Sequence, residues 1–175
     1  MNFLELINKC LLELNYRQVN SLSELVKNDH KRIIAILNII NKEICAIEGW
    51  NYLLRKTKLS LPATACIPAG NTELKNTVPG RIWYLLIDGQ KYKYCENVEP
   101  FLTGKAKIAT FSVCADKLLF PKFNKDKSID IVYYTKNCVS DSEGNEKEDF
   151  SEPSDISLIP MPFAEQLLVY GTCLR

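Results

Sequence analysis

Cysteine is the residue type with the widest chemistry in this sequence, because its thiolate can act as a nucleophile or as a metal ligand. The 175 residues include seven cysteines, widely scattered and without a C-x-x-C pair: Cys10, Cys45, Cys66, Cys95, Cys114, Cys138 and Cys173. An odd number at this spacing argues against a disulfide framework and against a zinc knuckle. Most lie in apolar stretches, where a reduced cysteine acts as a small hydrophobic residue. We therefore expect reduced thiols, folding in the cytoplasm, no metal and no cofactor.

His30 is the only histidine, which removes most metal sites and most acid–base mechanisms. It stands beside Asp29 at an expected helix start, where we expect a solvated side chain. A pairing of this histidine with one of the thiols stays open as a thiol-enzyme hypothesis, although no local signature marks a catalytic cysteine. Our main expectation is a protein with no catalytic residue and no enzymatic activity.

Two further segments match ligand-binding motifs only in part. Gly104-Lys105 lacks the upstream glycine and the following serine or threonine of a phosphate-binding loop. Between Asp141 and Asp155, seven acidic side chains accompany a single lysine, Lys147, but their spacing departs from that of a calcium-binding EF-hand loop. Because charges this dense repel one another, we expect an exposed, mobile acidic loop over residues 140–157.

Lysines and tyrosines of the expected strands offer one more binding chemistry. The lysines are Lys105, Lys107, Lys117, Lys122, Lys125 and Lys127, and the tyrosines are Tyr84, Tyr92, Tyr94, Tyr133 and Tyr134. Together they can stack and neutralise single-stranded nucleic acid, so a small sequence-nonspecific nucleic-acid-binding module is our second hypothesis. We prefer the alternative that the lysines protect strand edges and the tyrosines fill one face. The formal charge of +1 offers no overall cationic excess, so any contact with double-stranded DNA is expected to be passive.

Helical spacing dominates the first 49 residues. Leu4, Ile7, Leu11 and Leu14 predict a short helix that ends near Asn15. A capping box at Ser21 and Glu24 predicts a second, shorter helical turn. The strongest pattern predicts a helix from Asp29, as N-cap, to Glu48, with Gly49 as its stop. Its apolar face contains Ile33, Ile36, Leu37, Ile40, Ile44 and Ile47, and its outer face contains Lys31, Arg32, Asn38, Asn41, Lys42 and Glu43. Charged and amide residues interrupt this apolar run, so we expect no membrane span.

Extended segments follow Gly49. Alternating residues predict a strand from Trp50 through Tyr52 and Leu54 to Leu61, and the stretch from Pro62 to Gly80 predicts a long loop. Asp88-Gly89, after an apolar run and before Tyr92 and Tyr94, predicts a β-hairpin with a type I′ turn. Three more strands are expected, at Ala109 to Val113, Leu118 to Phe120 and Ile129 to Tyr134. From Pro162 onward, Phe163, Leu167, Leu168 and Leu174 predict a C-terminal helix.

These elements predict an α+β fold with N-terminal helices, including one long helix, a central antiparallel β-sheet or small sandwich, and a C-terminal helix. We expect a helical part at residues 1–49, a β-rich part at 50–139, the acidic loop at 140–157, and a C-terminal helix at 158–175 that packs back on the helical part.

Five segments follow one another in a recognisable order. They are Phe3-Leu4-Glu5-Leu6-Ile7, Glu48-Gly49-Trp50-Asn51-Tyr52-Leu53, Lys117-Leu118-Leu119-Phe120-Pro121, Ile129-Asp130-Ile131-Val132-Tyr133-Tyr134, and Ile159-Pro160-Met161-Pro162-Phe163 leading into a helix with Gly171. In this order the chain resembles, over nearly its whole length, the head-to-tail adaptor (connector) proteins of tailed phages, the group that includes tail tubular protein A.

The resemblance implies a structural virion protein that is made in the host cytoplasm and placed in the neck between capsid and tail. Family members form a homo-oligomeric ring, commonly a dodecamer, that binds the portal protein, surrounds the DNA channel and supports the tail or nozzle proteins. A ring needs two complementary surfaces on each subunit. Our candidates for the oligomer or portal interface are Lys31, Arg32, Asp88, Gly89, Phe163, Leu167 and Tyr170.

Overall fold

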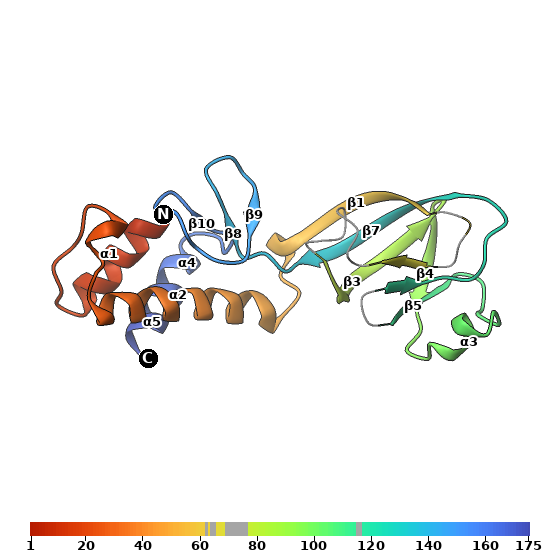
Figure 1. Cartoon of the computed structure of the whole chain (residues 1–175), viewed down its shortest axis with the longest axis horizontal. Helices are drawn as coiled ribbons and strands as arrows, with labels where there is room; N and C mark the ends of the chain where they lie inside the picture. Colours follow the sequence, from red (N-terminus) through yellow and green to blue (C-terminus); the bar gives the residue numbers. More distant parts are fainter. Residues whose placement is uncertain (62, 64–65, 69–76, 115–116) are drawn as a thin grey trace. The chain divides into compact units, whose positions relative to one another are not determined.

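The structure, a computed structural model, describes residues 1–61, 63, 66–68, 77–114 and 117–175. It contains two compact units: a helical unit of Met1–Leu53 with Lys136–Arg175, and a β unit of Leu54–Thr135 (Figure 1). The chain therefore has the predicted α+β fold, with N-terminal helices, a sheet and a C-terminal helix. Residues 136–157 belong to the helical unit, whereas the sequence assigned them to a β-rich part and an acidic loop.

Helix α1 (Phe3–Glu13) confirms the first predicted helix. The side chain of Asn2 accepts a hydrogen bond from the backbone N–H of Glu5 at 2.9 Å, and the Glu5 carboxylate accepts one from the backbone N–H of Asn2 at 2.8 Å. This reciprocal pair is a capping box. It fixes the start of the helix at a place where the sequence analysis expected no such signal.

Two helix-start signals that were predicted further along are wrong. Ser21 makes no capping hydrogen bond; its hydroxyl lies 3.4 Å from the carboxylate of Glu24 instead, and a single 3-10 turn follows at Leu22–Glu24. Asp29 is not an N-cap either, because it already lies inside helix α2 (Asn28–Ile47). In both cases the side chain is not bonded to the free amides of a helix start.

Helix α2 confirms the predicted long helix to within one residue at each end. Ile33, Leu37 and Ile40 are buried on its expected inner face. Two positions contradict the predicted faces: Ile47 is exposed, and Asn41 is fully buried. The covered face of the helix therefore differs from the predicted apolar stripe, because it includes Asn41 and leaves out Ile47.

Two asparagines of α2 form hydrogen bonds with the segment of the chain that follows β7, between residues 138 and 157. The amide of Asn41 donates to the carbonyl of Cys138 at 3.1 Å and accepts from the hydroxyl of Ser157 at 2.7 Å. Asn38 accepts from the backbone N–H of Phe150 at 2.8 Å and donates to its carbonyl at 3.3 Å. These side chains satisfy buried backbone groups, which is why assigning them to a solvent-facing surface was wrong.

The acidic segment is ordered by its own contacts and is not the fully exposed loop that its charge indicates. It contributes a small antiparallel sheet in the order β10-β8-β9, formed by β8 (Val139–Ser140), β9 (Glu146–Lys147) and β10 (Ile156–Ser157). The carboxylate of Asp155 is fully buried and accepts from the ammonium of Lys147 and from the backbone N–H groups of Ser151 and Glu152, each at 2.7 Å. Burial acts to raise the pKa of Asp155, but these three hydrogen bonds lower it overall.

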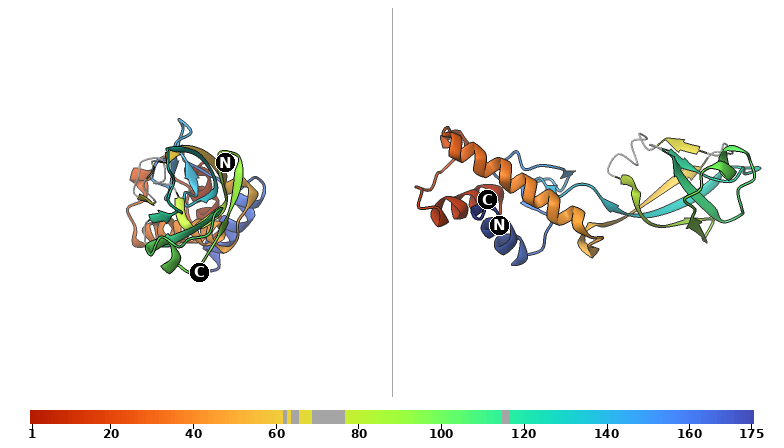
Figure 2. Two further views of the ribbon diagram at one scale, coloured as in Figure 1. Left: turned by 90° about the vertical axis from the view of Figure 1, so that its right-hand side faces the viewer. Right: turned by 90° about the horizontal axis from the view of Figure 1, so that it is seen from below.

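The predicted C-terminal helix is present but starts at Phe163, one residue after Pro162, where the prediction begins it. It is made of three consecutive pieces: α4 (Phe163–Glu165), a π-helical segment (Gln166–Tyr170) and α5 (Gly171–Cys173). It packs against α1 and α2 (Figure 2). Gly171 permits the close approach, because an added Cβ atom would come within 3.3 Å of the side chain of Ile40.

The β unit is a curled sheet whose described strands have the order β1-β7-β3-β4-β5-β6-β2. The strands are β1 (Leu54–Leu61), β2 (Cys66–Pro68), β3 (Thr77–Ile87), β4 (Gln90–Tyr94), β5 (Thr110–Cys114), β6 (Lys117–Leu119) and β7 (Lys127–Thr135), and a short helix α3 (Glu99–Leu102) precedes β5. The predicted antiparallel sheet is confirmed with one exception, since β4 and β5 pair in parallel.

The predicted β-hairpin is confirmed in detail. Strands β3 and β4 pair in the register Leu85 to Tyr92, and the intervening Asp88 and Gly89 have φ angles of +48° and +80°, as a type I′ turn requires. Leu85 and Tyr92 are both buried in the main core of the β unit, which also includes Phe111, Phe120, Ile129, Ile131 and Tyr133.

Two predictions at the start of the β unit need correction. Trp50 and Tyr52 are not part of a strand: a 3-10 turn spans Asn51–Leu53, and β1 starts only at Leu54. The predicted loop over residues 62–80 lies largely outside the described residues. Within it, residues 66–68 form β2 and residues 77–80 begin β3.

Candidate protein-interaction site

A hollow lined by apolar side chains lies on the surface of the helical unit, and we call it the apolar groove. It has a volume of about 370 Å³ and is lined by Ile44, Trp50, Tyr52, Ile159, Pro160, Phe163 and Leu167. Its residues come from the end of α2, the turn after it, the chain before the C-terminal helix, and that helix itself. Contiguous exposed apolar surface of this kind marks binding sites on proteins.

The two aromatic side chains after α2 are fixed before any partner arrives. The indole N–H of Trp50 donates to the carbonyl of Ile44 at 2.7 Å. This bond satisfies a carbonyl of the last helical turn that has no partner within the helix. The Trp50 ring also stacks on Tyr52, with centroids 6.0 Å apart and planes inclined by 13°. Because these rings are already ordered, little conformational entropy remains to be lost on binding.

The C-terminal helix supplies the other wall of the groove. Phe163 is 58% exposed and Leu167 is 46% exposed, while Ala164 and Leu168, one residue further along, are buried against the unit. The helix therefore has one face in the core and one face in the groove. Burial of such side chains by a partner would contribute about 25 cal/mol per Å² of apolar area removed from water.

The structure brings together only two of the predicted interface residues, Phe163 and Leu167. Tyr170, three residues further along, lines a different hollow together with Lys9 and Leu12 of α1. Trp50 is not among the predicted interface residues, because its alternation with Tyr52 predicts a strand. The bulky residues directly after Gly49 were the available signal.

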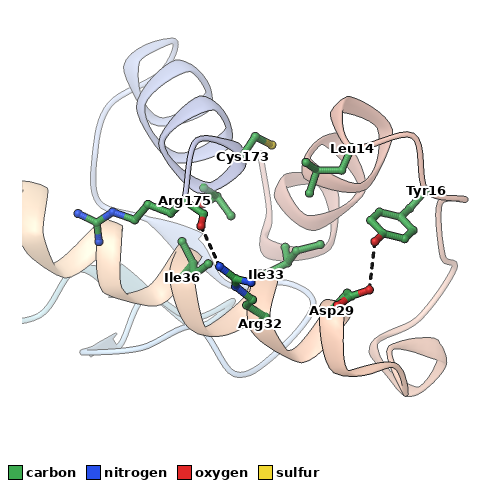
Figure 3. A pocket seen from close by; sticks show the side chains of 9 residues that line it. Leu14, Tyr16, Asp29, Arg32, Ile33, Ile36, Cys173 and Arg175 are labelled. Carbon is green, nitrogen blue, oxygen red and sulfur yellow. Dashed lines mark hydrogen bonds between the residues drawn. The ribbon is translucent and has the colours of Figure 1, made fainter.

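Lys31 and Arg32 are exposed on the first turns of α2. The guanidinium of Arg32 donates to the backbone carbonyl of Arg175 at 3.0 Å, beside a hollow whose floor includes Ile33 and Ile36 (Figure 3). Arg175 in turn forms an ion pair with Glu43 at 2.7 Å. Arg32 is therefore engaged within its own unit.

Asp88 and Gly89 lie at the hairpin tip of the β unit, and Asp88 is also bonded within its own unit. Its carboxylate accepts from the ammonium of Lys127 at 2.6 Å, and its backbone N–H donates to the carbonyl of Ser128 at 3.1 Å. The hydrogen bond from Lys127 is the main reason that the pKa of Asp88 is lowered. The tip is thus tied to the start of β7.

His30 is buried and not solvated as predicted. Its ring meets the edge of Tyr16 at a centroid distance of 6.1 Å, and the Tyr16 hydroxyl donates to Asp29 at 3.1 Å (Figure 3). Burial raises the pKa of Cys10 to about 12 and also raises that of Cys173. A raised pKa keeps both thiols protonated, whereas a nucleophilic cysteine needs a lowered one.

The tyrosines named in the nucleic-acid hypothesis are divided between the two faces of the sheet. Tyr92 and Tyr133 are buried in the core, whereas Tyr94 is exposed and Tyr84 and Tyr134 are half-buried. The core positions are therefore unable to stack a ligand. Tyr84 and Tyr134 lie close to Trp83, which was not among the predicted residues, whereas Tyr94 lies beside Phe111.

Within the described ranges, no group of three or more His, Cys, Asp or Glu side chains is placed to hold a metal ion. The helices of the same ranges include none with the length and apolar character needed to cross a bilayer. Comparison of the sequence with models of known protein families and with curated proteins finds no match.

Proposed function

We propose that this protein is a non-enzymatic structural component that assembles with copies of itself into a ring, as a head-to-tail adaptor in the neck of a tailed-phage virion. The observation that carries the assembly is the apolar groove of the helical unit. The proposed location in the virion neck rests on the order of the sequence elements, which resembles that of the adaptor family. In this role the portal protein and the tail or nozzle proteins are its partners, and double-stranded DNA passes without specific contacts.

The groove has the properties of a protein interface and not of a small polar-ligand site. Trp and Tyr are enriched among the residues that dominate binding energy at interfaces, and both occur here in fixed orientations. Its lining is almost entirely apolar, so it offers a polar substrate few hydrogen-bonding groups. An apolar segment of a neighbouring subunit suits such a surface.

The charges of the two units support a head-to-tail contact between copies. The β unit has 13 Lys and Arg against seven Asp and Glu, a formal charge of +6, while the helical unit has nine against 14, a formal charge of −5. The helical unit of one copy and the β unit of another therefore attract each other, whereas two helical units or two β units repel each other. A contact between two different surfaces can close into a ring, whereas a contact between identical surfaces gives a two-fold dimer.

The test is the molar mass of the purified chain by light scattering, with electron microscopy of the same sample. We expect the wild type at a multiple of its 20.0 kDa mass, as rings. Phe163→Asp should weaken association by at least about tenfold, because it places a charge in the apolar groove. An aspartate in the first turn of a helix is compatible with the helix itself.

Val26→Asp is the matched control, since Val26 is also an exposed apolar residue of the helical unit but does not line the groove. It should associate like the wild type. A wild type that stays monomeric up to about 100 µM, a weak affinity for any assembly, would contradict the proposal. If the Phe163→Asp and wild-type proteins associated equally, the apolar groove would not be part of the interface between subunits.

A further inference from the structure

A β-bulge in strand β3 turns two neighbouring aromatic residues away from the core of the β unit. Ile82 pairs with Tyr133 of β7 and Tyr84 pairs with Val132, so two steps along β3 correspond to one step along β7. Trp83 is the extra residue, and it is 58% exposed. Bulges commonly re-aim a side chain in this way, and they are frequent near functional sites.

Trp83 is the centre of an aromatic cluster on the outer side of the sheet, which we call the aromatic face: Trp83, Tyr84 and Tyr134. The Trp83 ring lies 5.3 Å from that of Tyr84 and 6.4 Å from that of Tyr134, measured between centroids. Tyr134 alternates along β7 with the buried Tyr133. Tyr134 is therefore positioned by regular strand geometry, whereas Trp83 is positioned by the bulge.

Cations surround the aromatic face. The guanidinium of Arg81 lies 5.9 Å from the Tyr134 centroid, and the ammonium of Lys91 lies 5.2 Å from the Tyr84 centroid. Lys56 of β1 pairs in register with Val132 of β7, and Val132 pairs on its other side with Tyr84 of β3. These distances are those of cation–π contacts. Arg81 and Lys91 therefore lie over the two tyrosine rings that neighbour Trp83.

The acidic groups near this surface do not cancel its charge. Asp130 of β7 forms an ion pair with Lys56 at 3.6 Å. Lys58, which pairs in register with Asp130, and Lys93 of β4 are both exposed. With Lys56, Arg81 and Lys91, the described residues on this side of the strands include five cationic side chains against the one carboxylate of Asp130, in a unit whose formal charge is +6.

We propose that the aromatic face binds single-stranded nucleic acid without reading its sequence, an unpaired base stacking on Trp83 while Lys56, Lys58 and Lys91 contact backbone phosphates. Every base has a planar face, so stacking on an exposed indole is tolerant of sequence. In double-stranded DNA the base faces are already stacked on one another and only the phosphates remain accessible. An acidic polypeptide supplies negative charge but no bases to stack. The binding site lies in the β unit and does not depend on ring assembly.

The experiment measures fluorescence anisotropy of labelled eight-nucleotide oligothymidylate and oligouridylate with the full-length chain at low salt. We expect both strands to bind, more weakly as salt rises because counterions are released from the phosphates. Trp83→Ala should weaken binding by about tenfold, since it removes the indole on which a base stacks. Trp83→Phe, which keeps a smaller stacking surface, should fall between the two.

A matched pair of double variants separates the aromatic face from charge in general. Lys56→Gln/Lys91→Gln removes two cations beside the rings, and Lys105→Gln/Lys107→Gln removes two from the segment between α3 and β5. The first pair should weaken binding by at least about fivefold more than the second, because only its ammonium groups lie at the face. Circular dichroism and the thermal midpoint confirm that each variant is folded.

Three results would overturn the proposal. One is a wild type that binds neither oligonucleotide at low salt, and another is a folded Trp83→Ala variant that binds as tightly as the wild type. The third is equal or tighter binding of an eight-base-pair duplex or of polyglutamate, which would identify the surface as a general polyanion contact. Trp83→Ala should leave the molar mass unchanged, so failure here and failure of ring assembly are separate outcomes.

Discussion

The helical unit and the β unit differ in charge and in the kind of surface that they expose. The helical unit has a formal charge of −5 and an apolar groove, whereas the β unit has a charge of +6 and an aromatic face bordered by cations. The overall charge of +1 conceals both values. The comparison teaches that charge has to be counted over the units that fold together, because their boundaries decide which partners each surface can attract.

Each unit also contains one tryptophan: Trp50 in the apolar groove of the helical unit and Trp83 in the aromatic face of the β unit. Trp50 is fixed to the end of α2 in the groove, and Trp83 is turned outward by the bulge. In both cases a local departure from regular structure, the turn after a helix or the extra residue in a strand, positions the ring. The two surfaces therefore have a similar kind of anchor but different surroundings.

The largest expected effect tests whether the two units are stabilised by separate cores. Leu37 of α2 and Leu85 of β3 are each fully buried in their own unit, so replacing either by alanine should cost about 2–5 kcal/mol of unfolding free energy. Urea unfolding is followed by the fluorescence of Trp50 in a Trp83→Phe background and of Trp83 in a Trp50→Phe background.

We expect Leu37→Ala to lower the midpoint reported by Trp50 and Leu85→Ala to lower the midpoint reported by Trp83. If either variant shifted both midpoints equally, the chain would unfold as one cooperative body, and the comparison of two units would lose its thermodynamic basis.

A smaller effect distinguishes the units by their response to acid. Asp155 has a lowered pKa in the folded helical unit, so its contribution to stability is present above its ordinary value of 3.8 and is lost as pH falls through the lowered folded value. Asp155→Ala should cost about 2 kcal/mol at pH 7, because three donors lose their acceptor. It should also flatten the loss of stability that the helical unit shows below about pH 4.

Asp88 is the corresponding control in the β unit. Its pKa is also lowered, chiefly by the hydrogen bond from Lys127, but half of its side chain is exposed to water. Exposed ion pairs contribute little, so Asp88→Asn should leave the β unit nearly unchanged in the same acid titration. A larger loss for Asp88→Asn than for Asp155→Ala would contradict this ranking of the two carboxylates.

The smallest effect concerns the hairpin turn and belongs to the β unit alone. Gly89 has a φ of +80°, and nothing lies within 4 Å of the position of an added Cβ atom. Gly89→Ala therefore adds backbone strain without a steric clash, and it should cost about 1 kcal/mol. Chemical denaturation followed by Trp83 fluorescence measures this loss of unfolding free energy. The midpoint reported by Trp50 should not change.

Elements with strong local signals were predictable from the sequence. The period of the isoleucines fixed α2, and Asp88-Gly89 fixed the hairpin, because in both cases neighbouring residues decide the backbone conformation. Asn41 was misplaced because it is buried against the carbonyl of Cys138, which is distant in the sequence. Asp155 was misplaced because its carboxylate is buried against the nearby backbone N–H groups of Ser151 and Glu152, in a turn that a count of charges does not reveal. Periodicity reports which residues are apolar, and it contains no information on which polar residues will find buried partners.

The candidate sites were predictable only in part for the same reason. Phe163 and Leu167 were found from helical spacing, but the groove also needs Trp50 from a segment more than a hundred residues earlier. The aromatic face depends on the bulge at Trp83, and a bulge changes which side of the sheet a residue occupies. Strict alternation with the buried Leu85 and Ile87 would therefore place Trp83 on the core side of the sheet, although it is exposed.

The most direct test of the account measures two variants in two assays. Phe163→Asp and Trp83→Ala are each compared with the wild type for molar mass and for binding of an eight-nucleotide single strand, short enough to occupy one subunit. The account predicts that Phe163→Asp loses mass and keeps binding, while Trp83→Ala keeps mass and loses binding. If each variant impaired both properties to the same degree, the division of function between the two units would be contradicted.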